Sequence, residues 1–298
     1  MTARASLSGV DAFAAGRLTR SLDPLHAVVY FAPEANEKFG ELGLDFRAHY
    51  FASRAAPMGA VSANVVAATF YNFSPQLVAN TIPGAWEVAS PATVTRARYE
   101  IVETALPRVL GDEFSQSAEL ARGAALLRRV AESIPNGDGR PLYAAHAELP
   151  WPDDRIAGLW HAVTLLREYR GDGHIAALVA NGVSGLDALI THTATGIGFN
   201  TEFARRSRGW SREEWDAATD GLVKRGVLRS AGELAPAGTD LRSKIEDLTD
   251  ELGYPPWRAL TENEADGLIG LAKAIREAVQ AAGVLPGGAF GPRYGQHR

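Results

Sequence analysis

Residues 153–174 constrain this chain more than any other part of its sequence. Apolar side chains recur there at the three- and four-residue spacing of a helix, which predicts a helix with a buried face. Asp153 and Asp154 stand where a helix cap is expected, and Gly171-Asp172-Gly173 is predicted to end the helix in a turn. The apolar stripe consists of Ile156, Leu159, Trp160, Val163 and Leu166. Such a helix has to pack against the rest of the chain.

The same helix carries polar side chains that a surface helix does not need. His161, Thr164 and Glu168 share one face, because they are three and four residues apart. His161 and Glu168 are two turns apart, roughly 10 Å along the axis, so they cannot chelate one ion together. The chain has no cysteine, and no His-x-x-x-His or His-x-x-Glu pair occurs. We therefore expect no metal site and no cofactor.

This mixture of charged and apolar residues favours the wall of a ligand pocket. Arg54 and Arg167 offer guanidinium forks that suit the carboxylate or phosphate of a small organic ligand. Aromatic residues such as Tyr50 would line the pocket. The predicted ligand-binding residues are His26, Tyr50, Arg54, His161, Arg167, Glu168 and His174. Since they come from both halves of the chain, we expect the pocket between the halves.

Two other interpretations of these residues stay open. If the protein is an enzyme, His161 and His174 can transfer protons near neutral pH, and Asp172 can orient a histidine. If the residues are structural, Glu168 or Asp172 pairs with a neighbouring arginine and ties the two halves together. No nucleophile elbow, dinucleotide fingerprint or P-loop is present to decide for an enzyme.

Capped helices follow one another along the whole chain, so the predicted fold is mainly α. A length of 298 residues suggests about two domains. The proline-containing residues 135–153 read as the linker between them. We predict an N-terminal helical domain over 1–134, the linker over 135–153, a winged-helix domain over 154–260, and a C-terminal helix and tail over 261–298.

The second half has the order of elements of a winged helix. Ser211 caps a helix that ends at Gly226, and two short extended runs, 227–229 and 233–235, follow as the predicted wing. The segment 73–79 resembles 199–205, and each is followed by a tryptophan and a serine-capped helix. An internal duplication of helix-turn-helix units is therefore a hypothesis.

Particular motifs extend this reading to a known family. The segment from Gly209 to Trp215, the run Lys224-Arg225-Gly226-Val227-Leu228 and residues 234–238 resemble a MarR-like winged helix. With His26–Glu34 and Tyr50–Gly59, the chain resembles the SalK-like helix-turn-helix family of actinobacteria, whose genes often lie near those of specialised metabolism. The resemblance implies the fold and a regulator-like role, and we expect a homodimer.

The predicted recognition helix is poorly suited to DNA. Residues 211–225 include three basic and four acidic side chains, and the first turn, which usually enters the major groove, is acidic. The net charge of -5 gives no general footprint for nucleic acid or an anionic membrane. The basic residues available for DNA are Arg205, Arg206, Arg208 and Arg212.

Three functions follow from these observations. The chain is predicted to be a small-molecule-binding, regulator-like winged-helix protein linked to specialised metabolism, and sequence-specific DNA binding is a possible but disfavoured addition. The alternative is an enzyme of specialised metabolism that uses the His/Arg/Glu pocket without a known cofactor motif. No run approaches the ~18 apolar residues of a membrane span, and we expect a cytoplasmic protein.

Overall fold

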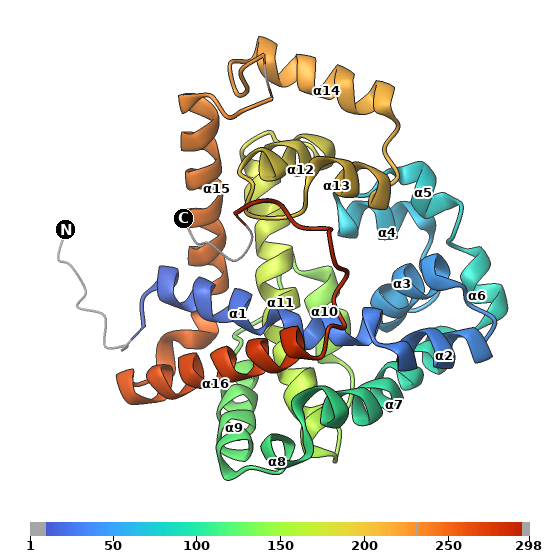
Figure 1. Cartoon of the computed structure of the whole chain (residues 1–298), viewed down its shortest axis with the longest axis vertical. Coiled ribbons are helices and arrows are strands. Elements are labelled where there is room, and N and C mark those ends of the chain that lie inside the picture. The colour runs from blue at the N-terminus through green and yellow to red at the C-terminus, as the bar shows by residue number, and fades with distance from the viewer. Residues whose placement is uncertain (1–9, 231, 294–298) are drawn as a thin grey trace.

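The computed structural model describes residues 10–230 and 232–293, and it confirms a mainly α protein (Figure 1). No β-strand occurs within these residues, which contain only isolated bridges. The N-terminal half contains α1 (Ala12–Phe31), α2 (Pro33–Glu41), α3 (Phe46–Ala55), a 3-10 helix (Ala56–Met58), α4 (Ala63–Phe70), α5 (Pro75–Ala79), α6 (Gly84–Val88), α7 (Pro91–Leu110), α8 (Asp112–Ser115) and α9 (Ala118–Glu132). The second half contains α10 (Pro141–Ala147), α11 (Arg155–Ala180), α12 (Gly185–Ala194), α13 (Thr201–Ser207), α14 (Arg212–Lys224), α15 (Pro236–Gly253), a second 3-10 helix (Pro255–Ala259) and α16 (Glu262–Ala281).

The helix predicted around residues 153–174 is α11, and it runs through the centre of the molecule (Figure 1). Asp154 caps it as expected, since its carboxylate accepts a hydrogen bond from the Ala157 amide at 2.8 Å. The predicted turn at Gly171-Asp172-Gly173 is wrong, because α11 continues unbroken to Ala180. A Cβ on Gly173 would lie 2.7 Å from the guanidinium of Arg140. The glycine therefore serves close helix packing, which offsets its low helix propensity.

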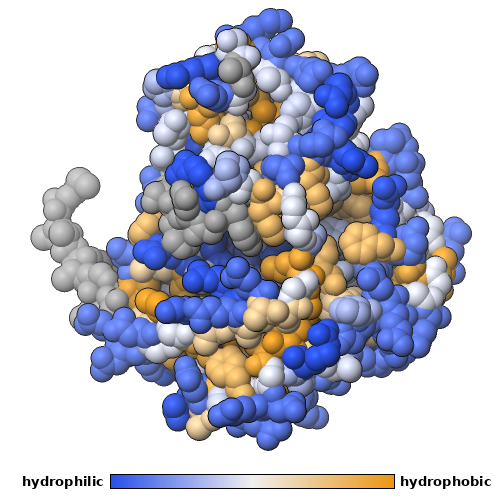
Figure 2. Space-filling view, in the orientation of Figure 1, coloured by the Kyte–Doolittle hydropathy of each residue, from blue (hydrophilic) through white to orange (hydrophobic). Residues whose placement is uncertain are grey.

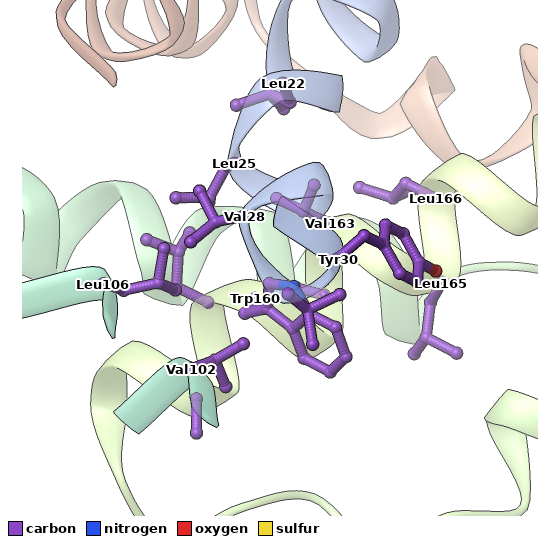
Figure 3. Close-up of a cluster of buried hydrophobic side chains, with 14 of the residues drawn as sticks. Leu22, Leu25, Val28, Tyr30, Val102, Leu106, Trp160, Val163, Leu165 and Leu166 are labelled. Carbon is purple, nitrogen blue, oxygen red and sulfur yellow. The ribbon is translucent and has the colours of Figure 1, made fainter. Parts of the chain in front are cut away.

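The main apolar core joins helices from both predicted domains. Figure 3 shows Leu25 and Val28 of α1, Leu106 of α7, and Trp160 and Val163 of α11 gathered in one cluster. All of these side chains are buried. Burial on this scale supplies the principal driving force for folding. The first and last helices, α1 and α16, also pack together, so the ends of the helical chain close on one another.

The region predicted as a linker, residues 135–153, contains a packed helix. This helix, α10, lies against α11 and buries Leu142 and Tyr143. Asp172 of α11 accepts hydrogen bonds from the amides of both residues, at 3.0 and 2.9 Å. The proline-rich composition reflects a helix start at Pro141 and turns on either side of it. The division into domains at 134 and 154 stays a prediction.

Helices α12, α13 and α14 form a separate small unit with a core of its own, built around Leu189, Ala204, Trp215 and Leu222. The Ser211 cap of α14 is confirmed and forms a capping box with Glu214. The predicted wing is reduced to one antiparallel bridge, between Leu228 and Leu234, and no strand is assigned there. This unit lies at the top of the molecule in Figure 1, and α15 leads back from it to the main core.

The two segments that suggested a duplication lie close together in the structure. The Arg208 guanidinium stands over the rings of both Phe73 and Phe199, at 4.6 and 5.2 Å from their centroids. In the first segment, the short helix α6 comes between α5 and α7, whereas α14 follows α13 directly. The duplication therefore stays a hypothesis about the origin of two unequal units.

The chain after α16 crosses the molecule to reach the loop between α12 and α13 (Figure 1). The amide of Asn200 donates to Ala289 at 2.9 Å, and the amide of Gly291 donates to Gly198 at 2.7 Å. Phe290 stacks on Phe199 with ring centroids 5.4 Å apart. Among the described residues, no single helix is both long and apolar enough to span a membrane; α11 and α12 meet both conditions only as a pair, which is bent by 101°.

Candidate functional site

The polar face of α11 is buried along its whole length, and each residue on it has a different partner. The His161 Nδ1 lies 2.8 Å from the Tyr99 hydroxyl, and the Thr164 hydroxyl lies 2.9 Å from His26 Nδ1. Glu168 contacts arginines, and Asp172 holds the start of α10. Since a buried polar group without a partner is costly, these contacts explain how the helix can carry such residues inside the core.

Glu168 is the centre of a buried ion cluster. Its carboxylate accepts from Arg167 at 2.5 Å and from Arg54 of α3 at 3.3 Å. Burial alone would raise the pKa of Glu168, but the two guanidinium groups outweigh it and hold that pKa well below its ordinary value. The predicted contact between Arg54 and α11 is therefore present, and it takes the form of an ion pair across the two halves.

His26 lies within this core rather than on an open surface. Its Nε2 is 3.0 Å from the Tyr30 hydroxyl and 4.0 Å from Glu168, and its ring stacks on Trp160. Burial, reinforced by the Arg167 charge, lowers the pKa of His26 well below its ordinary value. The imidazole is therefore neutral near pH 7 and acts as a hydrogen-bonding part of the core.

The three candidate catalytic residues do not share a site. His161 pairs with Tyr99, Asp172 accepts from the amides of α10, and His174 Nδ1 lies 2.9 Å from the Thr249 hydroxyl of α15. Burial lowers the pKa of His161 and that of His174 to about 4. His161 and Asp172 lie on the same face of α11 but roughly 16 Å apart along its axis, and His174, two residues after Asp172, points in another direction. The expected orientation of a histidine by Asp172 is therefore wrong.

A cavity of about 1470 Å³ lies between the N-terminal half and the α12–α14 unit. This volume exceeds the roughly 300–1,000 Å³ of an ordinary ligand pocket. On the face drawn in Figure 2, hydrophilic side chains line the hollow between the part that holds α14 and the part that holds α16. Of the predicted ligand-binding residues, Tyr50, Arg54, Arg167 and His174 line the cavity. His26, His161 and Glu168 are not among the lining residues, because they are buried behind the wall.

The cavity wall is strongly positive. It carries two acidic residues, Asp23 and Glu246, and eight arginines, which are Arg20, Arg54, Arg167, Arg170, Arg208, Arg242, Arg276 and Arg293. The two histidines in the wall, His174 and His192, both have pKa values lowered to about 4 by burial and therefore add no charge near pH 7. This excess of cations stands out in a chain whose net charge is -5. The arrangement attracts anions.

Part of this charge is balanced by Glu246 in the wall and by Asp250, which lies behind it. Arg170 of α11 bonds to Asp250 at 2.7 Å and lies 3.4 Å from Glu246, and Arg20 of α1 also bonds to Asp250, at 3.0 Å. Burial alone would raise the pKa of Glu246, but the charges of His174, Arg242 and the other arginines lower it to about 2. A Cβ on Gly16 would lie 2.0 Å from the Asp250 carboxylate, so this glycine permits α1 and α15 to approach.

Sequence reasoning missed most of the arginines in the wall. Of the eight, only Arg54, Arg167 and Arg208 are predicted as site residues from the sequence; Arg20, Arg170, Arg242, Arg276 and Arg293 are not, and neither is His192. The one sequence signal for these residues is their position relative to the apolar stripe of each helix, which could have placed their side chains on an inner face. The packing of α1, α11, α12 and α15 brings these side chains together, and no local sequence pattern specifies that packing.

The residues predicted to touch DNA divide into two groups. Arg206 and Arg212 are exposed. Arg205 is held by Glu202 at 2.9 Å and by the carbonyl of Trp210 at 3.0 Å, and Arg208 faces the cavity. The exposed first turn of α14 carries Glu213 and Glu214. Within the described residues, no group of three or more acidic or histidine side chains is placed to hold a metal ion.

Comparison with known proteins gives one match that covers most of the chain. The model of a helix-turn-helix family matches residues 15–286, which include both the main core and the α12–α14 unit. Neither the curated proteins nor the solved structures contain a match to this chain. The family match and the order of α12, α13 and α14 agree, and the chain belongs to this helix-turn-helix family.

Proposed function

We propose that this protein is a regulator-like member of its helix-turn-helix family that binds an anionic small molecule in the central cavity. The observation that carries the proposal is the wall of eight arginines against two acidic residues. Buried guanidinium groups without full compensation are costly, and an anionic ligand would supply the missing charge. An MarR-like or SalK-like role, and a ligand from specialised metabolism, belong to this proposal through the resemblance of the sequence.

The other residues of the wall favour an organic ligand over an inorganic ion. Aromatic rings from three parts of the chain line the same space, namely Tyr50, Phe70, Tyr71, Phe73 and Phe290. Ligand sites of this kind combine apolar surface, which supplies affinity, with a few charged groups, which fix orientation. An organic acid or an organic phosphate matches both features of the wall.

A thermal-shift screen of the purified protein tests this proposal. Aromatic and aliphatic carboxylates, organic phosphates and their neutral amides or alcohols are compared at equal concentration. An anionic ligand at 100 times its Kd should stabilise the protein by about 2.7 kcal/mol, which raises Tm by several degrees. The neutral analogues should give no shift. Equal shifts with charged and neutral compounds, or no shift with any anion, would contradict an anion-binding cavity.

DNA is the second partner that the helix-turn-helix family suggests. The exposed carboxylates of α14 disfavour its entry into the major groove, and only Arg206 and Arg212 of the four predicted basic residues are exposed. A gel shift at low salt, with DNA from upstream of the protein's own gene, decides this part. We expect weak binding that ligand strengthens or abolishes; no shift with or without ligand would remove DNA from the proposal.

A further inference from the structure

The turn between α13 and α14 holds a cation that the described residues leave uncompensated. Arg208 stands over the rings of Phe73 and Phe199, and its Nη1 donates to the Ser207 hydroxyl at 3.1 Å. Its Nε is buried and makes no hydrogen bond, and no carboxylate of the described residues forms an ion pair with it. Burial lowers the pKa of Arg208, because loss of solvent disfavours the charged form.

A second guanidinium with a free nitrogen stands beside it. Arg54 lies over the ring of Phe70 at 4.3 Å, and the rings of Phe70 and Phe73 are 6.1 Å apart. The Nη2 of Arg54 bonds to Glu168, while its Nε is buried without a hydrogen-bond partner. The charge of Arg54 further lowers the pKa of Arg208, as expected for two cations that face the same space.

The charges at this end of the cavity leave an excess of one. The guanidinium groups are those of Arg54, Arg167 and Arg208, and the carboxylates in contact with them are those of Glu168 and Asp23. One negative charge completes the balance. A carboxylate carries one charge, whereas a phosphate monoester carries close to two at pH 7.

We propose that Arg54 and Arg208 together bind the carboxylate of an aromatic monoacid, with its ring against Tyr50 and Phe73. The inference rests on the proposed function and names the ligand class of the same cavity. The rings of Tyr50 and Phe73 lie 5.9 Å apart in the wall and offer the apolar surface. The guanidinium groups of Arg54 and Arg208, which both line the cavity, supply charge-assisted hydrogen bonds, which are stronger than neutral ones.

A ligand at this site contacts both the N-terminal half and the turn that leads into α14 of the helix-turn-helix unit. The carbonyl of Arg208 accepts from the Ser74 amide at 2.8 Å, and the Trp210 indole donates to the Asn72 carbonyl at 2.9 Å. These bonds already tie the α13–α14 turn to the N-terminal half. A carboxylate held between Arg54 of α3 and Arg208 of the turn adds a further tie. Binding therefore fixes the orientation of α14 relative to the main core.

Calorimetry on the full chain tests the proposal with benzoate and 2-naphthoate as probes, and with benzamide and phenyl phosphate as comparisons. The variant is Arg208→Gln, and the matched control is Arg206→Gln, which removes an exposed arginine two residues away. Loss of one charge-assisted pair should weaken carboxylate binding about tenfold or more in Arg208→Gln. The control should bind as the wild type does, and benzamide should not bind.

Several results would overturn the carboxylate assignment. They are equal carboxylate affinity in Arg208→Gln and wild type, the absence of binding by both carboxylates, and tighter binding of phenyl phosphate than of benzoate. In the last case the cavity still takes an anion, so the proposed function stands while this inference fails. If Arg208→Gln does not fold, Arg208→Lys keeps the charge and loses the guanidinium fork; it should weaken benzoate binding, and unchanged affinity would equally overturn the proposal.

Discussion

At the scale of single residues, Glu168 shows how this molecule keeps charges inside its core. The carboxylate is fully buried, and two guanidinium groups and an imidazole surround it. Such a cluster adds little net stability relative to apolar packing, but removal of one member leaves the others uncompensated. The same reasoning explains why Arg208, which has no such partner, is the residue that points to a ligand.

Glu168→Gln should therefore destabilise the protein by about 3 kcal/mol. The change keeps the shape of the side chain but leaves the Arg54 and Arg167 charges without their partner. Urea unfolding, followed by circular dichroism, measures the loss. Glu132→Gln is the control, since Glu132 pairs with Arg128 on the surface, and it should cost less than about 1 kcal/mol. Equal losses in the two variants would show that the Glu168 cluster is not electrostatically coupled.

At the scale of elements, a side chain of α11 caps the first turn of α10. Asp172 accepts from two amides in the first turn of α10, and these groups have no partner within their own helix. Burial raises the pKa of Asp172 to about 6, while the two amide bonds act in the opposite direction. A residue predicted to orient a histidine thus has the role of a helix cap supplied by another helix.

Asp172→Ala should lower the free energy of unfolding by roughly 1–3 kcal/mol, because it leaves two buried amides without an acceptor. Hydrogen exchange should increase within 141–147 and remain unchanged in α14. Asp138→Ala is the matched control, since Asp138 is an exposed carboxylate just before α10. Unaltered protection of 141–147 in Asp172→Ala would show that α10 is held by its apolar contacts alone.

At the scale of the whole molecule, the burial of histidines sets the response to acid. Burial lowers the pKa of His146 to about 3, and that of His161, His174 and His192 to about 4. Between about pH 6.5 and pH 4 the histidines of the unfolded chain bind protons, whereas the buried histidines of the folded chain do not. The free energy of unfolding therefore decreases as the pH is lowered through this range. Asp172 acts in the opposite sense, since its raised pKa adds stability as pH falls from 6 to 4.

Because the histidines with lowered pKa outnumber the carboxyl groups with raised pKa, which are Asp23, Glu103 and Asp172, Tm should be lower at pH 5 than at pH 7.5. Each buried histidine contributes up to about 1.4 kcal/mol per pH unit in this window. The lowered pKa values of Glu168 and Glu246 reduce stability further only near pH 4 and below, where these carboxyl groups take up protons in the unfolded chain. Differential scanning calorimetry across pH 5 to 7.5 measures the trend. A Tm that stays constant or rises toward pH 5 would show that the imidazoles take up protons in the folded state.

Local patterns in the sequence are sufficient to predict the helical class of this protein and the capped starts of α11 and α14. These features depend on side chains a few residues apart, so a periodic pattern or a capping Asp154 or Ser211 is sufficient to predict them.

The packing of the whole chain is needed to explain why α11 continues past Gly171-Asp172-Gly173, why His161 and His174 lie apart, and why Arg208 lines a cavity. Each of these depends on contacts between residues distant in the chain. Burial and the balance of charge are properties of the packed molecule, and no local pattern specifies them.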